Sequence, residues 1–235
     1  MGNATLAMNP FDSSSPCRIV PFLLAGAAIL AAGPIRAQEV PGYPPLNPHT
    51  LLNGPYDPRE LALLPKYCYT TQIFREFAPG GRDKAEMDRW YALLGGTYHH
   101  LHHYCWGMMK SNRANLLARD HRVRQFFLND ALAEYDYVIE RAPADFVLLP
   151  EILAKKADNL FQLNRAPVAI FQLERAIELK PDYWPPYAKL ADYYKGVGQV
   201  QKAREILVVG LKAAPDAVGL KRRLSELEAA GNGKK

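Results

Sequence analysis

Serine is scarce in this chain of 235 residues: beyond residue 37 only Ser111 and Ser225 remain. The Gly-x-Ser-x-Gly sequence of serine hydrolases is absent, and so is a glycine-rich loop of the kind that binds phosphate. The carboxylates follow expected helix surfaces and do not converge in a way that the sequence can show. These absences favour a binding protein over an enzyme, and we expect no catalytic residue.

Long runs of basic residues are also absent, so the chain lacks the charge pattern of a nucleic-acid-binding protein. The net charge of +5 falls to about +4 when residues 1–37 are left out. The basic triplet Lys221-Arg222-Arg223 is followed by Glu226 and Glu228, which indicates a solvated helix face. We therefore expect no nucleic-acid partner.

An apolar run extends from Ile19 to Gly33, but it is shorter than the roughly 20 residues that a membrane-spanning helix needs. Arg18 precedes the run and Ala37 offers a small residue for cleavage, which is the pattern of an export signal. We interpret residues 1–37 as a signal peptide and expect a periplasmic or secreted protein that begins near Gln38. The alternative is an uncleaved N-terminal anchor, and only in that case do we expect contact with a membrane.

Cysteine is rare, and beyond residue 37 only Cys68 and Cys105 remain. Neither lies in the Cys-x-x-Cys-His arrangement that attaches haem. An exported protein meets an oxidising compartment, where an even number of cysteines indicates a disulfide. We therefore predict a bond between Cys68 and Cys105. Two alternatives stay open: both are buried free thiols, or Cys105 is a metal ligand.

The clearest pattern that is present is a repeat of 34 residues, with one segment closing at Pro181 and the next at Pro215. A period of this length is typical of stacked helix pairs. Asn164 and Gly198 fall between the two helices of each pair and tolerate the left-handed backbone of a turn. Small residues alternate with large apolar ones, so that two antiparallel helices can cross closely. The residues of the pattern are Leu153, Ala157, Leu160, Ala169, Leu173 and Ala176, then Tyr187, Leu190, Ala191, Tyr194, Ala203, Leu207 and Gly210.

These positions resemble the tetratricopeptide repeat, whose pattern has an aromatic residue, Leu-Gly, Tyr, Ala, another aromatic and a closing Pro. The resemblance implies an all-α fold, a short α-solenoid of antiparallel helix pairs, and a module that binds other proteins. It places one repeat unit at residues 150–183, a second at 184–217 and a capping helix at 218–230.

The same resemblance implies that the first helix of each unit faces the partner. The residues that it places on this face are Glu151, Ala154, Asp158 and Phe161 in one unit, and Ala188, Asp192 and Lys195 in the next. Members of the family that bind chaperone tails clamp a terminal carboxylate with Lys and Asn. Asp158 and Asp192 occupy two of those places, so we expect no such clamp here.

The residues before the two units are less regular. Residues 38–56, rich in Pro, Gly and Asn, predict an extended leader, and residues 57–97 predict an irregular helical extension. Asp57-Pro58-Arg59-Glu60 is typical of a helix start, and Asp83 can cap a second helix that runs to Leu94 and breaks at Gly95-Gly96. We interpret residues 98–143 as a degenerate repeat. A long basic connection around 119–124 would join a histidine-rich helix to a helix at 129–142.

Histidines are concentrated between Tyr98 and Trp106. On a helix that turns about 100° per residue, His99, His102, His103 and Trp106 share one face, and Cys105 lies on the opposite, apolar side. His99 and His103, with His102 beside them, could hold copper or zinc through imidazole nitrogens. No Asp or Glu lies within the cluster to complete such a site. Packed histidines without a ligand, or a surface for partner recognition, are open alternatives.

Together these patterns predict an exported, periplasmic adaptor or scaffold that works without a cofactor. We expect it to bind protein partners in the cell envelope, within an envelope or secretion-associated complex. The alternative function is a metal-binding or metal-handling protein that uses the histidine helix.

Overall fold

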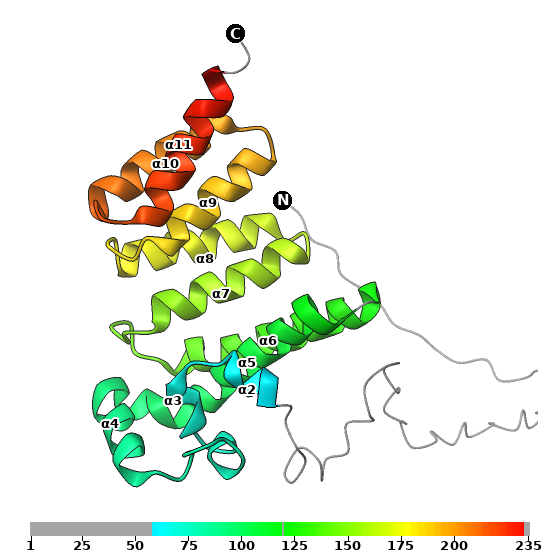
Figure 1. The fold of residues 1–235 in the computed structure, drawn as a ribbon, viewed down its shortest axis with the longest axis vertical. Helices are drawn as coiled ribbons and strands as arrows, with labels where there is room; N and C mark the ends of the chain where they lie inside the picture. The colour runs from blue at the N-terminus through cyan, green and yellow to red at the C-terminus, as the bar shows by residue number, and fades with distance from the viewer. Residues whose placement is uncertain (1–57, 119, 233–235) are drawn as a thin grey trace, which may run out of the picture. The chain divides into compact units, whose positions relative to one another are not determined.

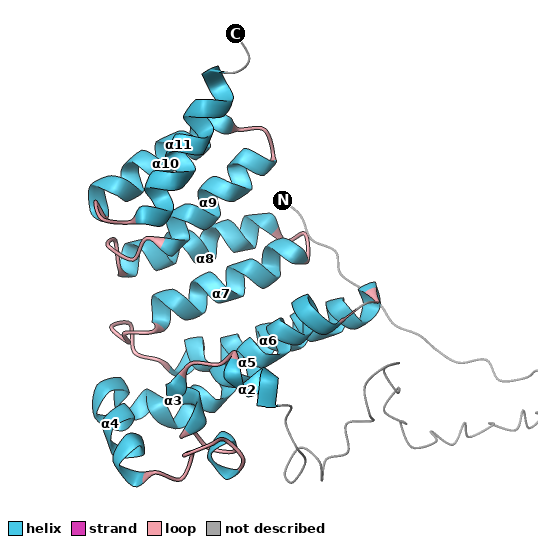
Figure 2. Ribbon diagram, viewed as in Figure 1, coloured by secondary structure: helices cyan, strands magenta, loops and turns pink. Residues whose placement is uncertain are grey.

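A computed structural model describes residues 58–118 and 120–232, and every regular element in these two ranges is a helix. Figure 2 shows these helices joined by loops, with no strand in the described part. The predicted all-α class is therefore confirmed. Within the same ranges no helix is both long enough and apolar enough to cross a membrane. The signal peptide predicted at 1–37 and the leader predicted at 38–56 lie outside the described residues.

The C-terminal part is a stack of helix pairs (Figure 1). α7 (Leu149–Gln162) pairs with α8 (Ala166–Leu179), and α9 (Pro185–Gly196) pairs with α10 (Val200–Ala213). α11 (Val218–Asn232) packs against both α9 and α10 at the end of the stack. The predicted solenoid of antiparallel pairs with a C-terminal capping helix is thus confirmed.

Both helix pairs turn at the residues that the sequence predicts. Asn164 has a φ of 58° and Gly198 a φ of 78°, in the left-handed region that these two residue types tolerate. The next N–H, from Arg165 or Gln199, donates 2.8 Å back to a carbonyl near the end of the preceding helix. The two turns are therefore equivalent at the repeat spacing.

Small residues set the distance between the helices. Ala169 and Ala203 occupy the same position in α8 and α10, and both are fully buried. A β-carbon at Gly210 would lie 2.8 Å from Cγ of Tyr187 on α9 and 2.9 Å from Leu220 on α11. Because real β-carbons do not approach other atoms so closely, this crossing requires glycine.

An irregular extension precedes the pairs. It contains α2 (Pro58–Ala62), α3 (Lys66–Tyr69), the 3-10 turn η1 (Phe74–Glu76), α4 (Lys84–Leu94) and the 3-10 segment η2 (Gly95–His100). Asp83 caps α4 by accepting hydrogen bonds from the N–H groups of Ala85 and Glu86. Gly95 ends α4 with a φ of 61°. Both ends of this helix lie where the sequence predicts them.

The pair before α7 consists of α5 (Leu101–Asn112) and α6 (His121–Arg141), joined through the π-turn η3 (Arg113–Leu117). The sequence predicts a basic connection at 119–124 and a helix only from Asn129, and this boundary is wrong. Asp120 accepts hydrogen bonds from the N–H groups of Arg122 and Val123, so the helix already begins at His121. Most of the expected connection is therefore the first turn of α6.

The buried side chains form two large clusters in the described part of the chain. One joins the N-terminal extension to α5, α6 and the start of α7, around Phe74, Tyr104 and Tyr135. The other runs from α7 to α11, around Leu173, Leu207 and Leu220. Since α6 packs directly against α7, the two clusters belong to one continuous stack.

Candidate functional site

Two equivalent ion pairs link α7 to α9 and α9 to α11. Lys189 on α9 donates to both carboxylate oxygens of Asp158 on α7, each at 2.6 Å. Arg223 on α11 donates to the carboxylate of Asp192 on α9, at 2.8 to 3.0 Å. Both members of the second pair follow the first by 34 residues, so α7, α9 and α11 are held in register. We call the surface that carries Glu151 and these two ion pairs the first-helix face.

The repeated ion pairs orient side chains more than they stabilise the fold. The Asp192 side chain is 52% exposed and the Asp158 side chain 35%, so solvent screens both pairs. Ion pairs this exposed contribute about 0 to 1 kcal/mol each to stability. Their main effect is to fix where charged groups lie along the three helices.

The residues predicted to bind a partner differ in burial, and only some of them lie on the surface. Ala154 and Ala188 are 1% and 3% exposed and belong to the core, so their expected place on an open face is wrong. Asp158 and Asp192 do lie on the surface between successive first helices, but each is already paired with a cation. Lys195 is exposed.

Phe161, the remaining apolar candidate, is half-buried and stacks on Tyr193 of α9, with 4.8 Å between the ring centroids. The stack links α7 to α9 beside the first ion pair. Phe161 therefore supports the first-helix face and is itself only partly open to a partner.

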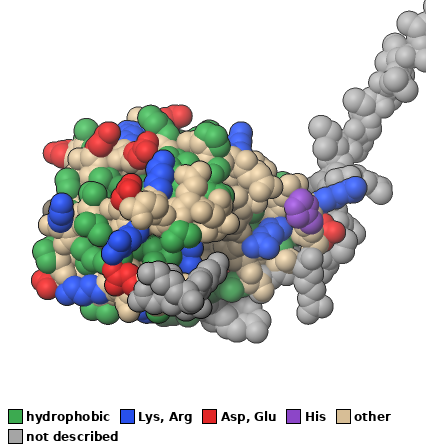
Figure 3. Space-filling view, turned by 90° about the horizontal axis from the view of Figure 1, so that it is seen from above, with side chains coloured by type: hydrophobic (Ala, Val, Ile, Leu, Met, Phe, Trp, Pro, Cys, Tyr) green, Lys and Arg blue, Asp and Glu red, His purple; other side chains and the backbone are tan. Residues whose placement is uncertain are grey.

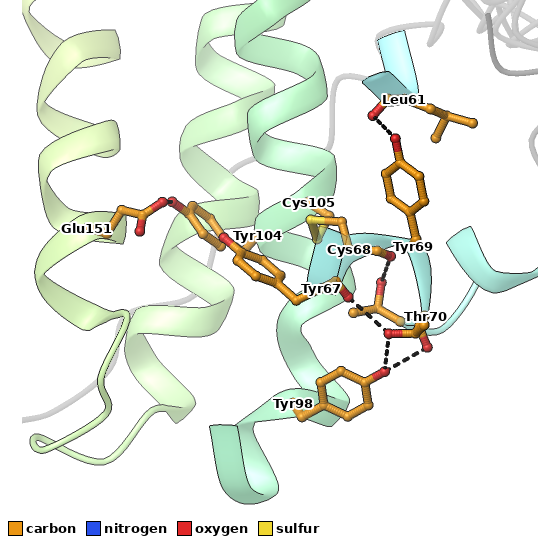
Figure 4. The surroundings of a disulfide bond; sticks show 10 residues. Leu61, Tyr67, Cys68, Tyr69, Thr70, Tyr98, Tyr104, Cys105 and Glu151 are labelled. Carbon is orange, nitrogen blue, oxygen red and sulfur yellow. Dashed lines mark hydrogen bonds between the residues drawn. A yellow bond between two sulfur atoms is a disulfide. The ribbon is translucent and has the colours of Figure 1, made fainter. Parts of the chain in front are cut away.

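Glu151 has a different environment from the two aspartates. Its carboxylate accepts a hydrogen bond of 2.7 Å from the hydroxyl of Tyr104 on α5 (Figure 4). Burial raises the pKa of the Tyr104 hydroxyl. Burial also raises the pKa of Tyr183 to about 12, with smaller contributions from the carboxylates of Glu151 and Asp158. On its α5 side, the first-helix face thus carries the carboxylate of Glu151, held by the hydroxyl of the buried Tyr104.

A buried polar network beneath this face was not foreseen from the sequence. Asn159 on α7 is 2% exposed and donates 2.8 Å to the hydroxyl of Ser111 on α5. Ser111 in turn lies 2.8 Å from the hydroxyl of Tyr135 on α6. Three helices meet here, and the three residues are too far apart in sequence for any local pattern to reveal the network.

The predicted disulfide between Cys68 and Cys105 is confirmed, with the two Cα atoms 5.7 Å apart. Both sulfurs are fully buried, and the bond ties α3 to α5 (Figure 4). Tyr98 supports the same junction, since its hydroxyl donates 2.8 Å to the carbonyl of Thr70. Cys105 is thereby excluded as a metal ligand.

The histidines do not share one helix face as the sequence suggests. His99 lies on the 3-10 segment η2 and packs against Tyr91. His103 lies on α5 and stacks on Tyr137 of α6, with 3.7 Å between the ring centroids. The expected face assumed a single α-helix from Tyr98 onward. Because η2 turns more tightly than an α-helix, His99 and His103 are not in an i, i+4 relation on one helix.

The neighbourhood of His103 contains an acid that the local sequence does not show. Nδ1 of His103 lies 2.6 Å from a carboxylate oxygen of Glu134 on α6, and Lys110 donates 2.6 Å to the other oxygen. No acid lies within the cluster in the sequence, but the fold brings the carboxylate of Glu134 against His103. His102 lies beside His103, and burial, followed by that neighbour, lowers the pKa of His102.

Metal binding by the histidines gains no support from this geometry. Among the described residues, no three His, Cys, Asp or Glu side chains are placed to hold a metal ion. The copper or zinc hypothesis for His99, His102 and His103 stays a prediction, which the metal content of the purified protein would test.

Comparison with known proteins gives a distant and partial similarity. No family model matches the chain. It is 29% identical over 101 residues to an Hsp70-Hsp90 organizing protein from Triticum aestivum. The match covers 43% of this chain and only 17% of that protein. The similarity is to a protein with tetratricopeptide repeats, and it agrees with the helix pairs seen here.

Proposed function

We propose that this chain is an exported adaptor or scaffold that binds a protein partner through the first-helix face. The observation that carries the proposal is the ion pair repeated from α7 to α9 and from α9 to α11. It sets equivalent charged groups at regular intervals along one surface, as a module that holds an extended partner requires. The partial similarity to a protein named for organizing Hsp70 and Hsp90 supports a role in protein interaction.

The sharpest test inverts the charges while keeping the ion pairs. Asp158→Lys with Lys189→Asp, combined with Asp192→Arg and Arg223→Asp, reverses every paired charge on the first-helix face. Because each pair can form again, helical content and melting temperature should stay near those of the parent. Partner capture, measured by crosslinking in the envelope fraction and mass spectrometry, should fall.

A matched control exchanges an ion pair elsewhere. Arg204 on α10 and Glu228 on α11 lie 3.2 Å apart, and Arg204→Glu with Glu228→Arg reverses that pair in the same way. The control should capture the parent's partners. If the swapped first-helix face captured them equally well, the partner site would have to lie on another surface.

Export is the second part of the proposal and has its own test. The disulfide suits an oxidising compartment, and the sequence of residues 1–37 has the pattern of a signal peptide. Fractionation with N-terminal sequencing should find a periplasmic or secreted protein beginning near Gln38. A cytoplasmic protein with its first residues intact and both cysteines reduced would overturn this part alone.

A further inference from the structure

The end of the α5–α6 pair projects past the neighbouring helices (Figure 1). α6 has 21 residues and α7 has 14. At about 1.5 Å per residue, α6 is therefore about 10 Å longer. The side chain of Arg124 donates to Gln162, the last residue of α7, so the first turn of α6 lies at and beyond that end.

Two large apolar side chains are exposed at this end. Leu116 on η3 is 64% exposed and Phe126 on α6 is 51% exposed. Beneath them Ala114, Phe127 and Leu128 form a small buried cluster of their own. The projecting end thus has a packed base and an apolar surface that no described element covers. We call Leu116, Arg122, Arg124 and Phe126 the basic tip.

The basic tip has two arginine side chains, and the carboxylate of Asp120 lies at the start of the same helix. In the described ranges neither Arg122 nor Arg124 forms an ion pair with a carboxylate, and Arg124 donates instead to the amide oxygens of Asn115 and Gln162. The carboxylate of Asp120 accepts hydrogen bonds from the first N–H groups of α6. The next acid along α6, Asp130, is paired with Lys110 at 2.8 Å.

We propose that the basic tip binds the surface of an anionic lipid bilayer. Arg122 and Arg124 would lie at the level of the lipid phosphates, with Leu116 and Phe126 entering the interfacial region. Cations combined with exposed apolar side chains are what interfacial binding requires. A lipid surface is favoured over an acidic peptide because the tip projects outward, and a projecting end provides no walls to hold an extended chain. Figure 3 shows basic, histidine and acidic side chains together on this projecting part.

This inference goes beyond the proposed adaptor function and does not depend on residues 1–37. An adaptor whose first-helix face binds protein would use the basic tip, on a different helix pair, to lie against a membrane. Failure of either proposal leaves the other intact, because the two surfaces share no residue.

The test uses the full chain and hydrogen exchange measured peptide by peptide. Vesicles of phosphatidylcholine with about one phosphatidylserine in three should slow exchange in residues 113–129, and pure phosphatidylcholine should not. Because the readout is local, contact of vesicles with residues 1–37 does not contribute to it. Arg122→Gln with Arg124→Gln should weaken vesicle binding through the tip about twenty-five-fold at low salt, since each arginine near an anionic surface contributes roughly fivefold.

One control removes charge at another surface, and two single variants change one residue of the basic tip each. Lys212→Gln with Lys221→Gln removes two cations from exposed positions on α10 and α11 and should leave the protection of residues 113–129 unchanged. Arg122→Gln alone spares the hydrogen bonds of Arg124, and Phe126→Ser removes one exposed apolar group. Each should reduce protection while the circular dichroism spectrum is kept. Equal protection of residues 113–129 by both vesicle types, or no protection at all, would overturn the proposal. Polyglutamate serves as the probe for an acidic peptide, and protection by polyglutamate but not by vesicles would overturn it as well.

Discussion

At the scale of single residues, glycine at the helix crossings decides how closely the helices approach. Gly210 has Tyr187 and Leu220 within 3 Å of where a β-carbon would lie, whereas a β-carbon at Gly196, the last residue of α9, would meet nothing within 4 Å. Gly210→Ala should destabilise the protein by about 1 to 3 kcal/mol through overpacking. Gly196→Ala should be neutral or stabilising by less than about 1 kcal/mol. Urea unfolding of the two variants measures both, and equal stabilities would contradict this account.

Tyrosine burial predicts how stability depends on pH. Burial raises the pKa of Tyr67, Tyr104, Tyr135 and Tyr183, the last to about 12. In the unfolded chain each hydroxyl has a pKa of about 10. Above pH 10 the folded protein therefore holds more protons than the unfolded chain. The contribution of these hydroxyls to the free energy of unfolding is complete below pH about 10 and is lost as the pH rises further. Urea unfolding at pH values from about 9 to 11 should show falling stability, and a flat profile would contradict the burial argument.

At the scale of elements, the disulfide attaches the short helices of the N-terminal extension to α5. α3 has only four residues, so its position depends on the bond and on the burial of Tyr67 and Tyr69. Cys68 and Cys105 are 37 residues apart. Closing a loop of that length stabilises a protein by about 3 to 4 kcal/mol in the chain-entropy treatment.

Cys68→Ser with Cys105→Ser should therefore lower the free energy of unfolding by about 3 to 4 kcal/mol. The measurement is urea unfolding of the parent with and without a reductant, beside the double variant. Reductant should lower the midpoint of the parent and leave that of the variant unchanged. A parent indifferent to reductant would show that the extension is held without the bond.

At the scale of the whole molecule, α11 closes the apolar end of the stack. Leu220 is fully buried against α9 and α10, while Val218, two residues earlier, is 75% exposed. Leu220→Ala should cost about 2 to 5 kcal/mol because it leaves a cavity under the cap. Val218→Ala is the matched control and should change stability by less than about 0.5 kcal/mol.

Repeat stacks lose stability from their ends, since each unit contacts only its neighbours. Hydrogen exchange in the Leu220→Ala variant should therefore accelerate most in α10 and α11 and least in α5 and α6. Uniform acceleration along the chain would indicate one cooperative unit instead. The comparison also tests whether the two core clusters unfold separately.

The sequence by itself determined the all-α class, the repeat spacing, both left-handed turns, the cap at Asp83 and the cysteine pairing. These features depend on periodicity, on backbone preference within a few residues, or on a count, and each can be recognised locally. Only the tertiary structure decided which side chains meet. Lys189, Arg223, Glu134 and Ser111 find their partners on other helices, about 20 to 50 residues away in the chain. The start of α6 is set by the local cap at Asp120, which the sequence contains but which the predicted boundary at Asn129 missed. The division of the histidines between η2 and α5 depended on packing, because helix propensity alone does not specify which type of helix forms.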